Sequence, residues 1–419
     1  MRWRRACATL IAAAAWIAPI ACQPGARPGA AVRPQGPAPQ TVVLVSLDGF
    51  RADYITRPGA VRLRALAAQG VRAGRMVPAF PSKTFPNHWS IVTGLYPEHH
   101  GIVANVMRDS VLGRFAIGDD PAVRDGRWFL GEPIWVTAEK QHVRTAANLW
   151  PGSEAEIAGV RPSWWMRFDP QLARAEKVRM TLELLTLPAD SAPRFVTTYF
   201  SDVDHAGHEF GPGDPRVDSA IARVDSAVGA LADGIAKLPA GRQVNLIVVA
   251  DHGMAEVSAD RQIFLDDYVS LDSLEVVDWT PVAAIAPRPG HDRYVLSRLV
   301  NANPHLAVYR RSEVPARFHF NEGGRITSVV AIADEGWTIT SHKGAARTPP
   351  DWKGGAHGYD NQLPSMGALF VAAGPAFRSG VVVPPFQNIH VYSLLANILG
   401  LKPAATDGSL DSVRVLLRR

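Results

Sequence analysis

Cysteine is scarce in this sequence. Cys7 and Cys22 are its two cysteines among 419 residues, and both lie near its start. A fold built from the rest of the chain therefore contains no disulfide and offers no thiolate to a metal ion. Blocks of like charge are also missing, because the formal net charge is +5 and the arginines are scattered along the chain. We therefore expect no stable nucleic-acid complex.

The first hydrophobic run is too short to span a membrane. It covers residues 6–21 and follows three arginines, a pattern that predicts a signal peptide over residues 1–22. Residues 23–40 are rich in Pro, Gly and Ala and are expected to form a flexible tether. Cys22 follows the run directly and resembles the end of a bacterial lipoprotein signal. Two bacterial locations stay open: the periplasm, as a soluble protein, and the cell envelope, through a membrane tether on lipidated Cys22.

Unbroken apolar runs of six or seven residues recur along the chain. Because such runs are buried on both faces, they predict central strands of a mostly parallel sheet. They are Thr41–Leu47, Phe195–Phe200, Val244–Ala250 and Ala368–Ala373. Helical patterns alternate with them, over residues 215–238 after the N-cap Asp214 and over residues 389–399 before Gly400. This alternation predicts an α/β fold with helices on both faces of the sheet.

The pattern of predicted secondary structure changes over residues 258–350. Short β-like runs alternate there with turns rich in Pro and Gly, which predicts an inserted α+β subdomain that caps one end of the sheet. The catalytic α/β domain is then expected to comprise residues 41–257 and 351–419.

Acidic and imidazole side chains follow three of the predicted strands. Asp48 follows the first, Asp204 and His208 the second, and Asp251 and His252 the third. Ligands of open α/β sheets bind outside the carboxyl ends of the strands, so these groups would converge. Converging carboxylates repel each other unless a divalent cation lies between them. A mixture of Asp and His suits zinc, and two such metals about 4 Å apart favour displacement at phosphorus.

A nucleophile is available in residues 81–88. Pro86 and the residues after it predict a helix that begins close to Thr84, where the partial positive charge of a helix N-terminus favours an alkoxide and a bound phosphate. Taken alone, a simple N-cap is the commoner use of a threonine such as Thr84, and Ser82 is a rival nucleophile on the same evidence. Lys83 and the pair His99–His100 are expected to be exposed to solvent.

Five segments, taken together, resemble the motifs of the nucleotide pyrophosphatase/phosphodiesterase family of the alkaline phosphatase superfamily. They occur in the family's order, and they cover nearly all of the chain from residue 41 onward. The resemblance is to the compact bacterial members, and it implies an alkaline-phosphatase-like fold. The segments are Val45–Arg51, Pro81–His88, Asp204–His208, Ala250–Met254 and Gly355–Gly358.

The resemblance implies two zinc ions and a catalytic threonine. One zinc would be held by Asp204, His208 and His357. The other would be held by Asp48, Asp251 and His252, with the oxygen of Thr84 as a further ligand. The resemblance thus favours Thr84 over Ser82 and implies a phospho-threonine intermediate in the release of nucleoside 5′-monophosphates from nucleotides.

The resemblance also assigns substrate contacts. Asn105 matches the family's phosphate-binding asparagine, while Phe85 and Tyr199 occupy the positions that sandwich a nucleobase, with Phe168 as a further candidate. Three alternatives stay open: a phosphomonoesterase, a phosphodiesterase for phospholipids or phosphocholine esters, and an inactive metal-dependent binding protein. The sequence does not determine the oligomeric state.

Overall fold

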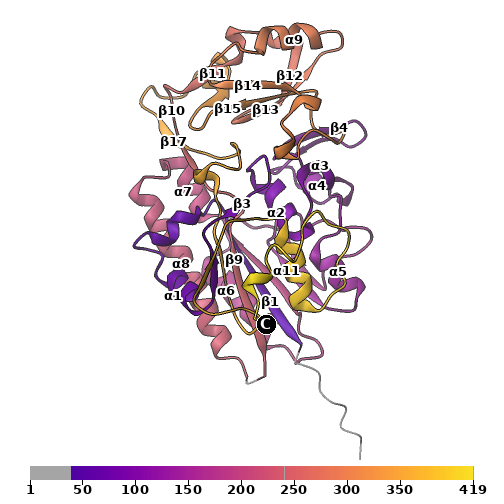
Figure 1. Cartoon of the computed structure of the whole chain (residues 1–419), viewed down its shortest axis with the longest axis vertical. Coiled ribbons are helices and arrows are strands. Elements are labelled where there is room, and N and C mark those ends of the chain that lie inside the picture. Colours follow the sequence, from indigo (N-terminus) through magenta and orange to yellow (C-terminus); the bar gives the residue numbers. More distant parts are fainter. Residues whose placement is uncertain (1–38, 240, 419) are drawn as a thin grey trace, which may run out of the picture. The chain divides into compact units, whose positions relative to one another are not determined.

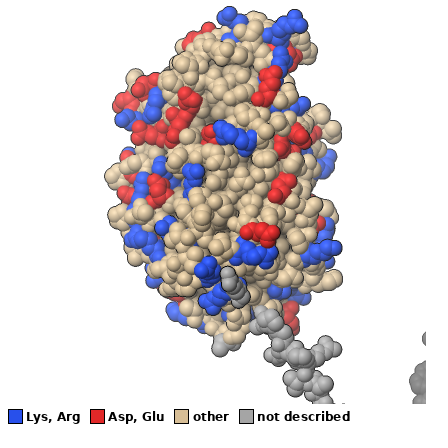
Figure 2. All heavy atoms as spheres, viewed as in Figure 1, with Lys and Arg blue, Asp and Glu red and all other residues tan. Residues whose placement is uncertain are grey.

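The computed structural model describes residues 39–239 and 241–418. The predicted signal peptide, Cys22 and nearly all of the predicted tether therefore lie outside the described residues. Among the described helices, none combines the length and the apolar character that a membrane crossing needs. Acidic and basic side chains are interspersed on the face shown in Figure 2.

An eight-stranded sheet forms the centre of the fold (Figure 1). The strand β1 (Gln40–Leu47) lies in its middle and pairs in parallel with β8 on one side and β9 on the other. Along the sheet the strands are β19 (Val381–Val383), β2 (Val71–Ala73), β18 (Phe370–Ala373), β9 (Gln243–Val249), β1, β8 (Phe195–Phe200), β6 (Thr145–Asn148) and β7 (Trp164–Met166).

The strand β18 departs from the predicted parallel direction. It lies inside the sheet as its unbroken apolar run indicates, but it is antiparallel to both neighbours, with Val371 opposite Val248 of β9 and Arg72 of β2. Its carboxyl end therefore lies at the opposite edge from the carboxyl ends of β1, β8 and β9. This explains why no acidic or imidazole group follows this run.

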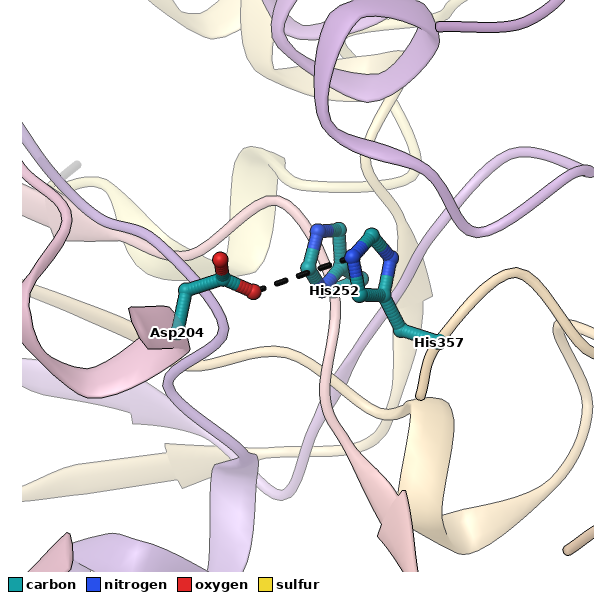
Figure 3. Close-up of side chains that lie close together, drawn as sticks. All are labelled: Asp204, His252 and His357. Carbon is teal, nitrogen blue, oxygen red and sulfur yellow. Dashed lines mark ion pairs between the residues drawn. The ribbon is translucent and has the colours of Figure 1, made fainter. Parts of the chain in front are cut away.

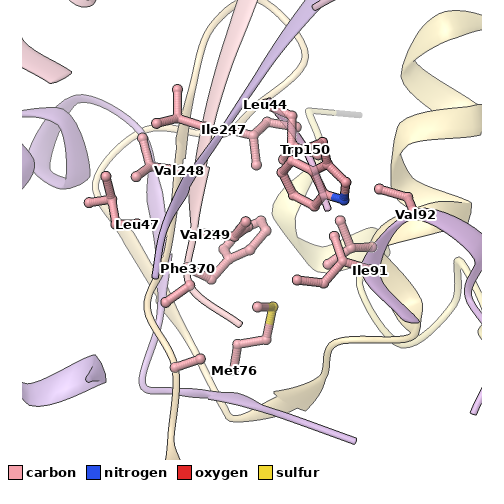
Figure 4. Close-up of a cluster of buried hydrophobic side chains, with 14 of the residues drawn as sticks. Leu44, Leu47, Met76, Ile91, Val92, Trp150, Ile247, Val248, Val249 and Phe370 are labelled. Atoms are coloured by element: carbon pink, nitrogen blue, oxygen red, sulfur yellow. The ribbon is translucent and has the colours of Figure 1, made fainter. Parts of the chain in front are cut away.

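Helices cover both faces of the sheet, as predicted (Figure 1). One layer contains α1 (Val61–Gln69), α6 (Arg174–Thr186), α7 (Asp202–Phe210) and α8 (Pro215–Ala236). The other contains α2 (Thr84–Thr93), α5 (Ile134–Lys140) and α11 (His390–Leu399). Side chains of the sheet, such as Leu44 and Phe370, pack there with Ile91 and Val92 of α2 (Figure 4).

A second sheet lies within the region predicted to be inserted. Its four antiparallel strands, in the order β12 (Leu274–Asp278), β13 (Val282–Pro287), β15 (Val329–Ala333) and β14 (Leu306–Arg310), are called the cap sheet below. With α9 (Asp292–Leu299) it has a hydrophobic cluster of its own. The antiparallel pair of β10 (Ala255–Ser258) and β17 (Lys353–Ala356) brackets this region in the sequence. The boundaries 258 and 350 stay a prediction.

Short elements complete the described chain. They are β3 (Met76–Val77), α3 (Pro97–His100), β4 (Val106–Asp109), β5 (Gly113–Ala116), α4 (Asp120–Val123), β11 (Gln262–Phe264), β16 (Thr338–Thr340), α10 (His342–Ala345) and β20 (Phe386–Gln387).

The expectation that His99–His100 forms an exposed loop is wrong for His100. Both residues belong to α3, which packs against α2, and His100 is fully buried. Its Nδ1 accepts a hydrogen bond from the Ile102 N–H (3.2 Å), and its Nε2 lies 3.0 Å from the Ser90 Oγ of α2. Burial lowers the pKa of His100 to about 3.

The N-terminus of α1 is capped by another helix. Its own N-cap residue, Ala60, has no side chain for this purpose. The buried Asp225 of α8 supplies the acceptors instead, with its carboxylate 2.9 Å from the Arg62 N and 2.8 Å from the Leu63 N. Two amides that the helix cannot satisfy internally are thereby paired, and the negative charge lies where the helix dipole favours it.

We expect Asp225→Ala to lower the free energy of unfolding by about 2 kcal/mol, because a buried amide and a partly buried one lose a charged acceptor. Asp233→Ala is the matched control, since Asp233 also lies on α8 and pairs with Arg62 but is exposed. It should cost less than about 1 kcal/mol. Urea denaturation followed by circular dichroism measures both values, and equal losses would contradict the capping role.

We also expect His100 to make the fold sensitive to acid. Its folded-state pKa lies below the unfolded value, so its contribution is complete above about pH 6.5 and is lost as the pH falls toward 3. At pH 5 the loss is about 2 kcal/mol. Urea denaturation at pH 7 and pH 5 should therefore show a smaller pH effect for His100→Asn than for the wild type. His142→Asn is the matched control, because it replaces an exposed histidine, and its pH effect should equal that of the wild type. An unchanged pH effect in His100→Asn would refute the role of His100 in acid sensitivity.

Candidate active site

The carboxyl ends of β1 and β9 bring together the first group of predicted site residues. Ser46 of β1 is opposite Val249 of β9, so Asp48 and Asp251 emerge side by side. Both are buried, as is His252. The His252 Nε2 lies 3.4 Å from the Asp48 Oδ1 and 2.9 Å from the Asp251 Oδ2. These three side chains can contribute one atom each to a single metal ion.

The second group comes from α7 and from the loop after β17. Asp204 and His208 are four residues apart on α7 and so share one face of the helix, with the His208 Nε2 3.4 Å from the Asp204 Oδ1. The His357 Nε2 lies 3.1 Å from the His208 Nε2 and 3.7 Å from the Asp204 Oδ1. The structure therefore gathers all three residues of the second predicted set.

The two groups adjoin each other. The rings of His252 and His357 stack with their centroids 3.5 Å apart, and both face Asp204 (Figure 3). Asp204, His252 and His357 can also share one ion. The six predicted Asp and His side chains consequently form one cluster, called the Asp/His cluster below.

The carboxylates of the Asp/His cluster have buried oxygens without hydrogen-bond partners. These are the Asp48 Oδ1, the Asp204 Oδ1 and the Asp251 Oδ2. Burial, together with the charges of Asp251 and Asp204, raises the pKa of Asp48 well above its usual value. Burial also acts to raise the pKa of Asp251, but His252 and His88 outweigh it and lower this pKa to about 2. Such a site needs added positive charge, and a divalent cation fits it.

The three imidazoles are oriented by backbone carbonyls. The Nδ1 atoms of His252, His357 and His208 lie 2.9, 2.8 and 2.8 Å from the oxygens of Gly253, Ser82 and Gly355. A carbonyl can only accept, so each Nδ1 carries a proton, and the Nε2 of each neutral imidazole has its lone pair free for a metal. Metal-binding histidines are usually held in this way.

Thr84 lies beside this cluster. It is the first residue of α2, and its Oγ1 is 3.2 Å from the His252 Nε2. The N-cap position belongs to Lys83, so Thr84 is not a simple N-cap. The hydroxyl of Ser82, the rival residue, is buried and donates to the Tyr359 carbonyl at 3.0 Å. Of the two hydroxyls, that of Thr84 contacts the cluster, and that of Ser82 is bound to a backbone carbonyl.

A cavity of about 570 Å³ opens next to Thr84 and contains the predicted aromatic residues. Phe85, Tyr199 and Phe168 all line it, together with Asp48 and Asp204 of the cluster. The Phe168 ring is 43% exposed and meets the Tyr199 ring edge to face at 5.9 Å. The cavity therefore joins a wall of aromatic rings to the carboxylates.

Two contacts in this region were not predicted from the sequence. The Tyr199 hydroxyl donates a hydrogen bond to the Asp48 Oδ2, so Tyr199 touches the cluster as well as the cavity. The Asn105 Oδ1 accepts a hydrogen bond from the Phe85 N–H at 3.0 Å, which fixes the side chain beside the start of α2.

Lys83 was predicted to be exposed, and this is wrong. The residue is only 4% exposed, and its ammonium group pairs with Asp278 of the cap sheet. His88 is also buried, with its Nδ1 2.9 Å from the Thr84 carbonyl and 3.4 Å from the Asp251 Oδ2. It therefore joins the first turn of α2 to the carboxylates.

Known proteins resemble this chain over most of its length. Residues 42–360 match the family described as type I phosphodiesterase/nucleotide pyrophosphatase. An uncharacterized pyrophosphatase/phosphodiesterase of Schizosaccharomyces pombe is 38% identical over 393 residues, which are 90% of this chain and 80% of that protein. A bis(5′-adenosyl)-triphosphatase of Mus musculus is 38% identical over 380 residues, 90% of this chain and 81% of that protein.

The fold agrees with a solved structure. Murine ectonucleotide pyrophosphatase/phosphodiesterase 5, solved as an inactive threonine-to-alanine variant in complex with AMP, superposes with a TM-score of 0.85. It is 34% identical, and the match covers 90% of this chain and all of that one. The motifs, the arrangement of their residues and these matches lead to one conclusion: the chain belongs to the type I phosphodiesterase/nucleotide pyrophosphatase family of the alkaline phosphatase superfamily.

Proposed function

We propose that the chain hydrolyses phosphodiester and phosphoanhydride bonds of nucleotides and releases nucleoside 5′-monophosphates, with Thr84 as the nucleophile. One observation carries the proposal: the Thr84 hydroxyl adjoins six Asp and His side chains at the mouth of a cavity lined by Phe85 and Tyr199. Two relatives support it, since one is named for hydrolysis of a bis-adenosyl triphosphate and the other was solved with AMP.

The donor set fits two zinc ions. Asp204, His208 and His357 would hold one, and Asp48, Asp251, His252 and the Thr84 oxygen would hold the other. Divalent cations bound there would neutralise the carboxylates and act as Lewis acids toward a hydroxyl and a phosphoryl group. The unpaired oxygens of the three carboxylates and the Nε2 lone pairs of the neutral imidazoles support this part of the proposal.

The residues of this chain then perform a double displacement. The Thr84 hydroxyl gives up its proton to water, its Oγ1 attacks phosphorus in line, the P–Oγ1 bond forms, and the bond to the leaving oxygen breaks. The N-terminus of α2 favours negative charge on the phosphoryl group, and the Asn105 amide donates to one of its oxygens. Water then cleaves the phospho-threonine, which releases the monophosphate and restores the hydroxyl.

The cavity supports a nucleotide as the substrate. The aromatic rings of Phe85, Tyr199 and Phe168 belong to its lining, where a base would contact them. Stacking on aromatic side chains contributes about 1–3 kcal/mol per base and tolerates every base. The aromatic wall therefore favours a diester that carries a base over a plain phosphate monoester.

Thr84→Ala should abolish turnover, with a loss of at least about 10³-fold, because no other hydroxyl replaces the nucleophile. Two zinc ions should stay bound, since the six Asp and His ligands are intact. The measurements are release of p-nitrophenol from a nucleotide p-nitrophenyl ester and metal analysis of the purified variant. Ser82→Ala is the matched control and should keep activity within about tenfold of the wild type. Retained activity or lost zinc in Thr84→Ala would refute the proposed role.

The preferred substrate can be tested on the wild type with three p-nitrophenyl compounds. We expect kcat/KM for the nucleotide ester to be at least about tenfold higher than for p-nitrophenyl phosphate or p-nitrophenyl phosphocholine. Only the nucleotide ester carries a base that can stack on the aromatic wall. Preference for the phosphocholine ester would favour a lipid-type phosphodiesterase, and preference for the phosphate a monoesterase. A zinc-loaded protein that hydrolyses none would be a binding protein.

A further inference from the structure

Lys83 directly precedes the proposed nucleophile, yet its ammonium group pairs with a carboxylate outside the Asp/His cluster. Its Nζ pairs with the Asp278 Oδ2, and the two side chains are 6% and 15% exposed. Asp278 ends β12 of the cap sheet. A buried ion pair thus links the residue beside Thr84 to a strand about two hundred residues further along the chain.

The local structure of β12 fixes the Asp278 carboxylate. The register of β12 against β13 shifts between Val276 and Asp278, an irregularity of the kind that redirects a side chain. The Asp278 Oδ1 accepts a hydrogen bond from the Trp279 N–H at 3.0 Å, which leaves Oδ2 for Lys83. The carboxylate is therefore a defined anchor rather than a mobile surface charge.

The segment that carries the nucleophile, residues 81–84, is held on its other sides as well. The Ser82 carbonyl accepts from the His357 Nδ1 at 2.8 Å, and the Lys83 carbonyl accepts from the Asn87 N at 3.1 Å. The Lys83 stem lies against Gly358, where an added Cβ would approach the Lys83 Cε to 3.1 Å. The Lys83 side chain is buried, and the cavity of about 20 Å³ that it lines has room for about one water molecule, so the ammonium group cannot reach bulk solvent unless the residues around it move.

We propose that the Lys83–Asp278 pair is a positioning contact that fixes residues 81–84, and with them the Thr84 hydroxyl, against the cap sheet. This inference rests on the proposed function of Thr84. None of the described residues that line the cavity beside Thr84 comes from the cap sheet. The cap sheet thus contributes to catalysis through Lys83 without touching the substrate in that cavity.

The physical reason is the cost of a buried, unpaired charge. Removing one partner of a buried pair leaves the other without compensation, and the survivor must then reach water. For Lys83 this requires movement next to Thr84. A displacement of about 1 Å at a reacting group lowers the rate by about 10²-fold.

The rival role for Lys83 is direct binding of substrate phosphate. The two roles differ in what Asp278→Asn does. If Lys83 positions Thr84 through the pair, loss of the carboxylate impairs catalysis as loss of the lysine does. If Lys83 binds phosphate directly, Asp278→Asn releases its charge, and turnover stays constant or rises.

A double-mutant cycle tests the inference, with Asp278→Asn, Lys83→Met and the two combined, assayed on the p-nitrophenyl compound that the wild type hydrolyses best. Each single exchange should lower kcat by about 10- to 100-fold while KM changes by less than about threefold. The combined variant should be no worse than the poorer single variant. Asp278→Glu, which keeps the carboxylate, should restore part of kcat, and zinc content should match the wild type.

Glu275→Gln is the matched control, because Glu275 lies on the same strand and also forms an ion pair, with Arg108 of β4. This pair is far more exposed than the Lys83–Asp278 pair, since the side chains of Glu275 and Arg108 are 43% and 50% exposed. The control exchange should keep kcat within about twofold of the wild type. Hydrogen exchange of the peptide over residues 81–88 gives a readout that does not need turnover. Asp278→Asn should speed this exchange, and Glu275→Gln should not.

Full kcat and unchanged exchange in Asp278→Asn would overturn the inference, as would a loss confined to Lys83→Met. Failure of the proposed function has a different signature. A wild type that hydrolyses no phosphodiester refutes that function, while faster exchange in Asp278→Asn still supports the positioning contact.

Discussion

Mutual repulsion of three carboxylates is the constraint on which this active site depends. The parallel strands β1, β8 and β9 end at one edge of the sheet, so Asp48, Asp204 and Asp251 converge there. Burial prevents water from screening them, and it raises the pKa of Asp48 together with the neighbouring charges. Added positive charge relieves this repulsion and keeps the carboxylates ionised. The chemistry proposed for Thr84 uses that same requirement, because a site built to hold cations also stabilises charge on phosphorus.

Backbone carbonyls fix the orientation of the imidazoles that surround these carboxylates. The oxygens of Gly253, Gly355 and Ser82 each fix one imidazole of the cluster through its Nδ1. Ser82 belongs to the same segment as Thr84, so one short stretch of chain sets both the orientation of His357 and the place of the hydroxyl. A shift of this stretch would move the proposed ligand His357 and the proposed nucleophile Thr84 together, and the contact of Lys83 with the cap sheet opposes such a shift.

Local patterns in the sequence were enough to predict the centre of the sheet and most of the cluster. Asp48 and Asp251 were found because burial on both faces requires unbroken apolar runs, and ligands gather where such strands end. The direction of β18 was not predictable, because an apolar run looks the same in either direction. Lys83 and His100 were misjudged because burial of a polar group depends on partners, and Asp278 lies 195 residues from Lys83 in the sequence. His357 follows a short Gly-rich strand with no apolar run to mark it, so only the family motif indicated it.

Tyr199 shows how the cavity and the cluster depend on each other. Its ring forms part of the aromatic wall, while its hydroxyl donates to the Asp48 Oδ2. His88 makes a comparable link, because it contacts both the Thr84 carbonyl and Asp251. Tyr199, which would bind a base, is therefore connected by a direct hydrogen bond to Asp48, which would hold a metal. In such a site, binding energy from the base can be used to orient the reacting groups, so that recognition of a nucleotide acts on turnover as well as on affinity.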